Sequence, residues 1–312
     1  METLKNKVDF SVVFSVKGAN PNGDPLNGNR PRTNYDGYGE VSDVCIKRKI
    51  RNRLMEAEIP IFVQSDDNRV DDYRSLRSRV EGELGKDILN DENKLREESC
   101  KKWFDVRAFG QVFAYTSMGS KKRKKEKEVA EEKTDTPGVS VGIRGPVSIH
   151  SAFTVSPIGA NISSIQITKS VSGEGDGEKK ASDTMGMKHR VDNGVYVFHG
   201  AINPQLASKK TRTGTGFSDD DAKEIKKALE HLFDNDASSA RPEGSMEVQL
   251  VIWWAHNCPT GQYSSATVHR ALDVKQKKED PKGIEDCSIK IKKLPGLEPE
   301  IFNPNKVAIE RS

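Results

Sequence analysis

The chain has 312 residues, of which 34% are hydrophobic and 31% are charged, and its net charge is +3. This length allows one elaborated domain or two smaller ones, each with a real core. Since the net charge is small, an interpretation as a nucleic-acid-binding protein has to rest on local clusters of Lys and Arg.

Several features argue against secretion and membrane insertion. The N-terminal run METLKNKVDF lacks the apolar region of a secretory signal. No run approaches the roughly 18 apolar residues of a membrane helix. The four cysteines are scattered without a C-x-x-C pair, which favours free thiols in a reducing compartment. We therefore expect a cytoplasmic protein without a membrane partner.

The first third of the chain begins with a strand and a helix. Residues 8–17 alternate apolar and polar side chains, which predicts a half-buried strand. A loop rich in Gly, Asn and Pro follows over residues 18–41. Ser42 or Asp43 then offers an N-cap for a helix that carries apolar residues at i, i+4 spacing. Residues 60–99 are polar and mixed, and we expect short helical stretches there at best.

The rest of the chain alternates further predicted elements with charged or glycine-rich segments. A second structured block begins at residues 103–113, and residues 121–138 are charged without apolar periodicity, which predicts a mobile loop. A glycine-rich acidic excursion occupies residues 172–183. The pattern predicts strands over 141–155, 194–202 and 245–255, and a helix over 218–234 with acidic residues in its first turn.

The predicted order is strand, helix, strand, strand, helix, strand. This is the βαββαβ order of ferredoxin-like and RRM-like α+β domains. We therefore expect a single elaborated domain over residues 1–312. Its large insertions fall at about 60–100, 115–140 and 157–193, and residues 259–312 form a C-terminal extension.

Three enzymatic or ligand motifs were tested on the loop NPNGDPLNGNR, and each fails. Asp24 stands where a phosphate loop requires Lys, Pro25 and Pro31 replace the glycine and glutamate of a calcium loop, and no G-x-G-x-x-G is present. The six histidines show no nucleophile or metal spacing. We expect no cofactor, no metal and no catalytic residue. Asp24 either positions a metal or a water, or forms a turn before Pro25.

The helix sequence DVCIKRKIRNRL concentrates basic residues within two turns, against the single acid Asp43. Lys47 and Arg51 share a face at i, i+4 spacing, with Arg48 beside them. Such a face either binds phosphates or is an ordinary solvated surface, and its lack of interleaved Glu favours phosphate binding. Asn20 and Asn22 in the preceding loop offer amide partners for phosphate and ribose oxygens.

Two further basic clusters follow. The run TMGMKHRVDNG combines two thioethers with basic residues ahead of a strand, which suits contact with an unstacked base and its phosphate. A hairpin that packs its methionines on a neighbour is an equal alternative. The residues of this cluster are Met185, Met187, Lys188, His189 and Arg190. A weaker third patch contains Lys209, Lys210 and Arg212.

The run N-P-N-G-D-P-x-N-G-N-x-P-R (20–32), followed by VSDVCIKRKIRN (41–52), resembles the backbone subunits of type I-C CRISPR surveillance complexes. These form the Csd branch of the Cas-seven family, in the RAMP superfamily. The runs WFDVRAFGQVF, IRGPVSIHSAF and TMGMKHRVDNGVYVFHGAINP fit the same family. The resemblance covers residues 5–258, whereas residues 60–100, 121–137 and those beyond about 260 match no family pattern.

The resemblance implies an RRM-like palm with inserted fingers and a thumb, the latter at residues 157–193. Copies would stack head-to-tail along a CRISPR guide RNA, which pairs with target DNA while the protein holds its backbone. Other surveillance-complex subunits and a recruited nuclease-helicase would be partners. The RNA-binding residues it implies are Lys17, Asn20, Asn22, Lys47, Arg48, Arg51, Arg144, Met185, Met187, Lys188, His189 and Arg190.

Two alternatives remain beside a non-catalytic scaffold. An endoribonuclease of the same superfamily would process precursor CRISPR RNA, and a generic module would bind single-stranded RNA as a monomer. Type III relatives cut RNA with an Asp in a loop after the first helix, and no equivalent is evident in this sequence. Since type I backbones are not nucleases, the resemblance favours the scaffold.

Overall fold

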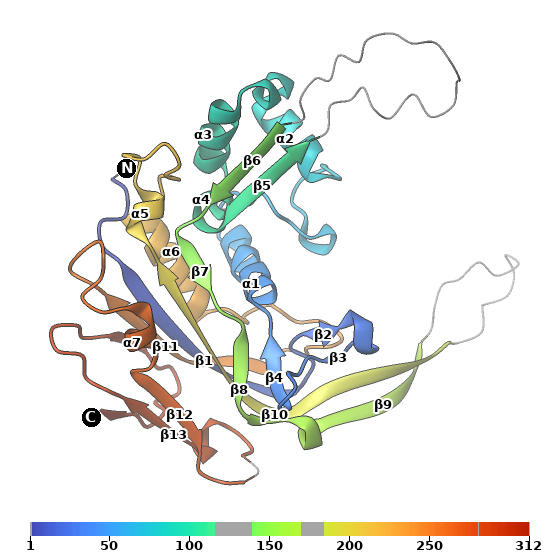
Figure 1. The fold of residues 1–312 in the computed structure, drawn as a ribbon. Coiled ribbons are helices and arrows are strands. Elements are labelled where there is room, and N and C mark those ends of the chain that lie inside the picture. Colours follow the sequence, from blue (N-terminus) through green and yellow to red (C-terminus); the bar gives the residue numbers. More distant parts are fainter. Residues whose placement is uncertain (1, 116–138, 170–183, 280, 312) are drawn as a thin grey trace, which may run out of the picture.

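The computed structural model describes residues 2–115, 139–169, 184–279 and 281–311, which fold around one large antiparallel sheet (Figure 1). Its strand order is β14-β11-β1-β10-β8-β4, and β7 and β9 also pair with β10. The strands are β1 (Val8–Ala19), β4 (Tyr38–Val41), β7 (Val147–Ile149), β8 (Ala152–Pro157), β9 (Ile162–Lys169), β10 (Thr184–Ile202), β11 (Met246–Ala255) and β14 (Glu300–Phe302). The strands predicted over residues 8–17 and 245–255 are confirmed as β1 and β11.

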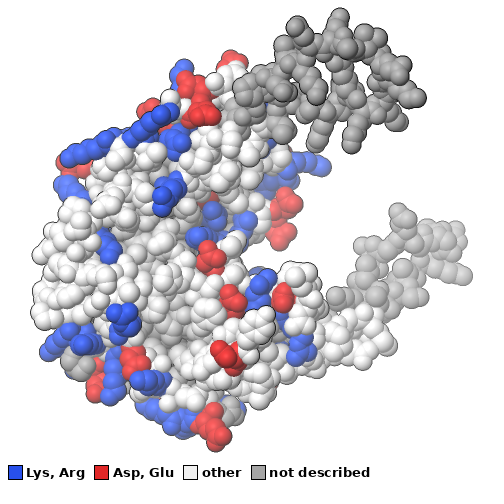
Figure 2. All heavy atoms as spheres, in the orientation of Figure 1, with Lys and Arg blue, Asp and Glu red and all other residues white. Residues whose placement is uncertain are grey.

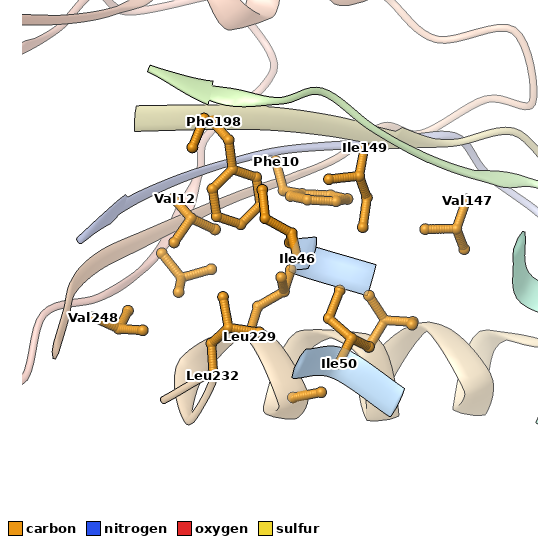
Figure 3. Packing of buried hydrophobic residues seen from close by; sticks show 14 of the residues in the cluster. Phe10, Val12, Ile46, Ile50, Val147, Ile149, Phe198, Leu229, Leu232 and Val248 are labelled. Atoms are coloured by element: carbon orange, nitrogen blue, oxygen red, sulfur yellow. The ribbon is translucent and has the colours of Figure 1, made fainter. Parts of the chain in front are cut away.

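Two helices cover one face of the sheet. They are α1 (Asp43–Glu56), which begins after Ser42, and α6 (Asp219–Glu230), which Ser218 and Asp221 start with a reciprocal capping box. Figure 3 shows Ile46 and Ile50 of α1 and Leu229 of α6 pointing into the apolar layer beneath the strands. Both predicted helices are confirmed, because caps and apolar spacing are local signals.

The second face of the sheet is covered by the C-terminal segment. It contains α7 (Ser265–His269), β12 (Leu272–Gln276), η6 (Ile284–Asp286), β13 (Cys287–Ile291) and β15 (Glu310–Arg311). A separate core forms there between the sheet residues Val13, Leu250 and Trp254 and the segment's Ile289 and Ile291. The expectation of a half-buried β1 is therefore wrong: both of its faces are covered, and the polar Asp9 and Ser11 are fully buried.

A helical lobe, defined here as residues 60–115 and 139–144, stands above α1 (Figure 1). Its elements are η2 (Asp66–Asn68), α2 (Leu76–Leu84), η3 (Lys86–Asn90), α3 (Glu92–Lys102), α4 (Phe104–Phe109), β5 (Gly110–Tyr115) and β6 (Val139–Arg144). Its own core includes Phe62, Val80, Leu95 and Trp103. The short helical stretches expected over residues 60–99 are present, and the sparse apolar residues of these separate helices meet in this core. The predicted loop over residues 121–138 lies outside the described residues, as do the acidic excursion's residues 172–183.

The single strand predicted over 141–155 is also wrong, because the segment divides between two sheets. β6 pairs with β5 in the helical lobe, whereas β7 and β8 join the main sheet. Pro146 lies at the division and has no N–H to donate to a ladder. At the preceding Gly145, an added Cβ would lie 2.2 Å from the carbonyl oxygen of Ala108. This pair of residues thus permits a close backbone crossing and a change of sheet.

The third predicted strand, at 194–202, extends much further than the pattern indicates. β10 begins at Thr184, and its first half pairs with β9 in a two-stranded ribbon, called the arm here, that projects from the sheet (Figure 1). The cluster predicted ahead of a strand is therefore inside it. A short η5 (Gly159–Asn161) precedes the arm, and α5 (Pro204–Ala207) follows β10. Within the described ranges, no helix is long and apolar enough to cross a membrane.

Candidate nucleic-acid interface

The glycine- and asparagine-rich loop folds into a closed hairpin made of β2 (Gly23–Asp24), η1 (Pro25–Asn27) and β3 (Arg30–Pro31). Asp24 caps η1, since its carboxylate accepts a hydrogen bond from the backbone N–H of Leu26 at 3.2 Å. Gly28 and Asn29 then reverse the chain with left-handed φ angles of 58° and 59°. Of the two roles considered for Asp24, the structure thus places it in the turn-forming one.

Asn20 and Asn22 hold this hairpin in place through their side-chain amides. The oxygen of Asn22 accepts hydrogen bonds from both the backbone N–H and the hydroxyl of Ser42, each at 3.0 Å. Asn20 is 4% exposed and donates to the backbone carbonyl of Asn29 at 2.7 Å. Because Ser42 is the N-cap of α1, Asn22 fixes the hairpin to the start of that helix. Both amides are thus engaged within the protein.

The predicted basic face of α1 is largely covered by the helical lobe. Arg51 is 9% exposed, and its Nε donates to the buried carboxylate of Asp105 at 2.8 Å. Arg48 donates to the backbone carbonyl of Val63 at 3.0 Å, and burial lowers the pKa of Arg48, with the nearby Arg51 adding to the effect. Lys47 is 23% exposed and pairs with Asp43 at 3.0 Å. The expectation of a solvent-facing row of cations is therefore wrong for Arg51.

The neighbouring Lys49 is buried as well. It forms an ion pair with Asp236, whose carboxylate also accepts from Arg241 at 3.1 Å. Asp105 and Asp236 lie 54 and 187 residues from their partners on α1. The helix thus uses its cations on two sides, toward the helical lobe and toward the segment after α6. The helix sequence shows the basic residues but not the acids that pair with them, because those acids lie far away in the chain.

The arm carries the second predicted cluster and divides it between two faces. Successive side chains of a strand point in opposite directions, so Met185, Met187 and His189 lie on one face and Lys188 and Arg190 on the other. The two methionines are 73% and 55% exposed. The alternative in which they pack on a neighbouring part of this chain is therefore wrong for the described residues. Two exposed thioethers in a row form an apolar, adaptable strip.

The arm and the hairpin meet at Ser164 of β9. Its hydroxyl lies 2.7 Å from Nδ1 of His189 and accepts from the guanidinium of Arg30 at 3.2 Å. On the other face, Arg190 donates to Ser163 at 3.0 Å and lies 3.4 Å from Asp192. The structure thus brings the first and second predicted clusters together. Sequence reasoning missed Arg30, and the signal that could have found it is its place in the NGNRPR run after the turn.

Two further predicted residues lie outside this junction, in different parts of the fold. Lys17 is exposed near the end of β1, opposite Asn193, where the arm leaves the sheet. Arg144 is exposed at the end of β6, in the helical lobe. Figure 2 shows that the molecule is hollowed on the side between the helical lobe and the arm, with basic and acidic side chains mixed along the hollow. This concave surface is called the hollow below.

The cations around the hollow differ in how they are compensated. Lys17, Lys188 and Arg144 form no ion pair within the residues that the structure describes, and Arg30 is bonded to a neutral hydroxyl. Uncompensated cations are the ones that attract a phosphate backbone. A search of the same residues finds no group of three His, Cys, Asp or Glu side chains placed to hold a metal ion. The geometry therefore provides anion-binding groups around the hollow.

These observations define a mixed α+β protein with a large antiparallel sheet, a projecting arm and a hollow beside it. Residues 6–292 match the family described as CRISPR-associated protein Cas7. Since the match spans most of the chain, the protein belongs to this family.

Similar proteins include a CRISPR-associated protein Cas7 of Haloferax volcanii, 25% identical over 203 residues. This alignment covers 64% of the chain and 58% of that relative, so more than a third of the relative's length has no counterpart in the match. Two solved structures also resemble the fold over 98% of the chain. One, a CRISPR RNA-guided surveillance complex, pre-nicking, is 12% identical with a TM-score of 0.42 over 96% of its chain. Another CRISPR RNA-guided surveillance complex is 14% identical with a TM-score of 0.40 over 94% of its chain.

Proposed function

We propose that this protein is a non-catalytic backbone subunit of a type I-C CRISPR surveillance complex that binds guide RNA. Its copies assemble head-to-tail along the guide and present it for pairing with target DNA. The observation that carries the proposal is the junction of arm and hairpin at Ser164. Membership of the CRISPR-associated Cas7 family supports it. Other complex subunits and a nuclease-helicase that acts on the bound target are its expected partners.

The strand order supports an RRM-like palm. Reading β1, β8, β10 and β11 as the four strands of a βαββαβ unit gives the order fourth, first, third, second, all antiparallel, with α1 and α6 on one face. In this assignment the insertions at about 60–100 and 115–140 are the fingers. Residues 157–193, which include the arm, are the thumb. Residues 259–312 are the extension that covers the second face.

The exposure and pairing of side chains revise the set of proposed RNA contacts. Lys17, Arg30, Lys188 and Arg144 have no acidic partner among the described residues, so they are the proposed backbone contacts, with the partly exposed Lys47 beside them. Cation contacts with phosphates contribute affinity without reading sequence.

Four other predicted residues act indirectly in this proposal. Arg48, Arg51, Asn20 and Asn22 shape the surface from within through the hydrogen bonds described above. On the arm, Met185 and Met187 are exposed on the face that also carries His189, where they would meet an unstacked base. Arg190, on the opposite face, is placed beside the phosphate of the same nucleotide.

The double variant Lys17→Ala with Lys188→Ala tests the RNA-binding surface. Both side chains are solvent-accessible and lack ion pairs among the described residues, so the fold should survive their loss. We expect weaker binding to guide-length RNA of any sequence. The slope of log affinity against log salt should fall by about 1.4, because each lost single-strand phosphate contact removes about 0.7. The matched control is Lys292→Ala with Lys293→Ala, two exposed lysines of the C-terminal segment, which should change neither quantity.

Size-exclusion chromatography with guide-length RNA tests assembly. A ladder of several copies per RNA supports the backbone subunit, whereas a single copy per RNA supports a monomeric RNA-binding module. Incubation with repeat RNA, with and without divalent metal, tests the remaining alternative. Specific cleavage that is lost in Asp24→Ala would replace the scaffold with a processing endoribonuclease.

A further inference from the structure

A second basic site lies on the other side of the helical lobe from the hollow. A cavity of about 790 Å³ opens between α3 and the loop 208–216 that follows α5. Figure 1 places α3 and α5 at the opposite end of the molecule from the arm. Figure 2 shows Lys and Arg side chains, with Asp and Glu beside them, over the edge where these two elements face each other. The volume lies within the ~300–1,000 Å³ of ordinary ligand sites.

The loop that forms one wall is ordered by its own hydrogen bonds. The backbone N–H groups of Thr215 and Gly216 donate to the carbonyls of Leu206 and Ala207 at 3.0 and 2.9 Å, which closes the loop on α5. Gly216 has a left-handed φ of 80°. At Gly214, a Cβ would lie 1.8 Å from the carbonyl oxygen of Ser208. The two glycines therefore allow a compact turn that holds the intervening basic residues in place.

Three of the cations in this cavity form no ion pair among the described residues. Arg96 donates to the carbonyl of Gly142 at 2.9 Å, and Arg212 donates to the side-chain oxygen of Asn93 at 3.2 Å, so both have neutral partners. Lys209 is exposed and forms no ion pair in the described part of the chain. The remaining lining cations, by contrast, pair with acids that also line the cavity: Lys101 with Glu97 and Arg107 with Asp221.

The floor of the cavity adds no negative charge. Cys100 is buried there, and burial raises the pKa of its thiol to about 11, although Arg96, Arg107 and Lys209 act in the opposite direction. The thiol is therefore neutral at physiological pH. Arg96 and Lys209, which come from opposite walls, both line this cavity.

We propose that this cavity binds phosphate groups of a nucleic-acid strand other than the guide. The planar guanidinium groups of Arg96 and Arg212 suit phosphate oxygens, and Lys209 supplies a point charge between the walls. The hydroxyl of Thr211 lies exposed on the rim as a further donor. Because the cavity and the hollow lie at different ends of the molecule, one subunit can hold both strands. The identity of the first strand rests on the proposed function, whereas the binding chemistry of the cavity does not.

The test uses the full chain saturated with unlabelled guide-length RNA, to which a labelled, non-complementary single-stranded DNA is added. Anisotropy titrations at several salt concentrations then compare wild type with Lys209→Ala plus Arg212→Ala. We expect binding of the added strand to weaken at least tenfold, and its salt slope to fall by about 1.4 for two lost phosphate contacts. Affinity for the guide should stay unchanged. Lys292→Ala with Lys293→Ala, again the matched control, should behave as wild type.

Three outcomes would overturn the inference. Saturated wild-type protein could fail to bind the added strand, the double variant could bind it normally, or polyglutamate could displace it as well as a nucleic acid of equal charge does. The last outcome would assign the cavity to an acidic protein segment. If the protein binds no guide RNA at all, the proposed function fails. The cavity can then be tested by the same titration on the chain without guide RNA. The Lys17→Ala with Lys188→Ala variant can be titrated in the same way, because neither residue lines the cavity.

Discussion

The ion pair between Arg51 and Asp105 joins α1 to the helical lobe, and Arg51→Met tests how much it stabilises the fold. Asp105 is 1% exposed, and its carboxylate also accepts from the backbone N–H groups of Phe62 and Val63 at 2.7 and 3.1 Å. Removing one partner of a buried pair costs about 3–5 kcal/mol. Since these two donors still compensate the carboxylate, we expect a loss of about 3 kcal/mol, at the lower end of that range.

Urea unfolding followed by tryptophan fluorescence measures this loss. Of the three tryptophans, Trp103 is 2% exposed at the start of α4 and reports on the lobe that the ion pair holds, whereas Trp253 and Trp254 report on β11 of the main sheet. Lys47→Met is the matched control, because its ion pair with Asp43 is 23% and 37% exposed and should contribute less than about 0.5 kcal/mol. A loss below about 1 kcal/mol for Arg51→Met would refute the structural role. Unchanged stability with weaker RNA binding would return Arg51 to the direct contact that the sequence predicted.

Three further predictions concern other parts of the fold. Burial lowers the pKa of His199 from 6.5 to about 4. The unfolded chain therefore binds the extra proton first, and stability present above pH 6.5 is lost as pH falls toward 4. Between pH 7 and 4.5 we expect a loss of about 2 kcal/mol in urea unfolding, and His199→Asn should flatten this dependence. Gly110→Ala should lower the free energy of unfolding by about 2–4 kcal/mol, since φ is 82° and the new Cβ would lie 2.3 Å from the backbone oxygen of Ile143. Its control is Gly142→Ala, which should be nearly neutral because open space surrounds that position. A double change of Met185 and Met187 to Ser should weaken RNA binding and leave the thermal midpoint within 2 °C of the wild-type value, roughly the shift that 0.5 kcal/mol causes in a domain of this size. A large drop in the midpoint would mean that the arm packs on the protein itself.

The basic helix shows why charge clusters in a sequence are ambiguous. Lys49 and Arg51 stand beside Lys47 in the chain, yet they face Asp236 and Asp105, which come from distant segments. The helix contacts both the helical lobe and the segment after α6, so its cations meet acids from both. Only the partly exposed Lys47 of these three remains accessible. The pattern therefore identified a basic helix, and the surface position that it predicted is wrong for Arg51.

The sequence by itself determined the local elements. Alternation in β1 and β11, the Ser42 and Ser218 caps and the apolar spacing of α1 and α6 are short-range signals, and the structure agrees with each. The motif-level resemblance likewise identified the family that the match over residues 6–292 shows.

The tertiary structure alone decided what those elements meet. The burial of both faces of β1 depends on a C-terminal segment more than 240 residues away in sequence. The pairing of Val8 with Ala255 of β11 joins residues that are almost as far apart. The arm becomes a continuous part of β10 because β9 pairs with it, which no pattern within residues 184–193 specifies. Cation pairing, strand length and the placement of two basic surfaces at opposite ends all arise from long-range contacts. Periodicity reports which side of an element is apolar, whereas its partners are set only when the chain closes on itself.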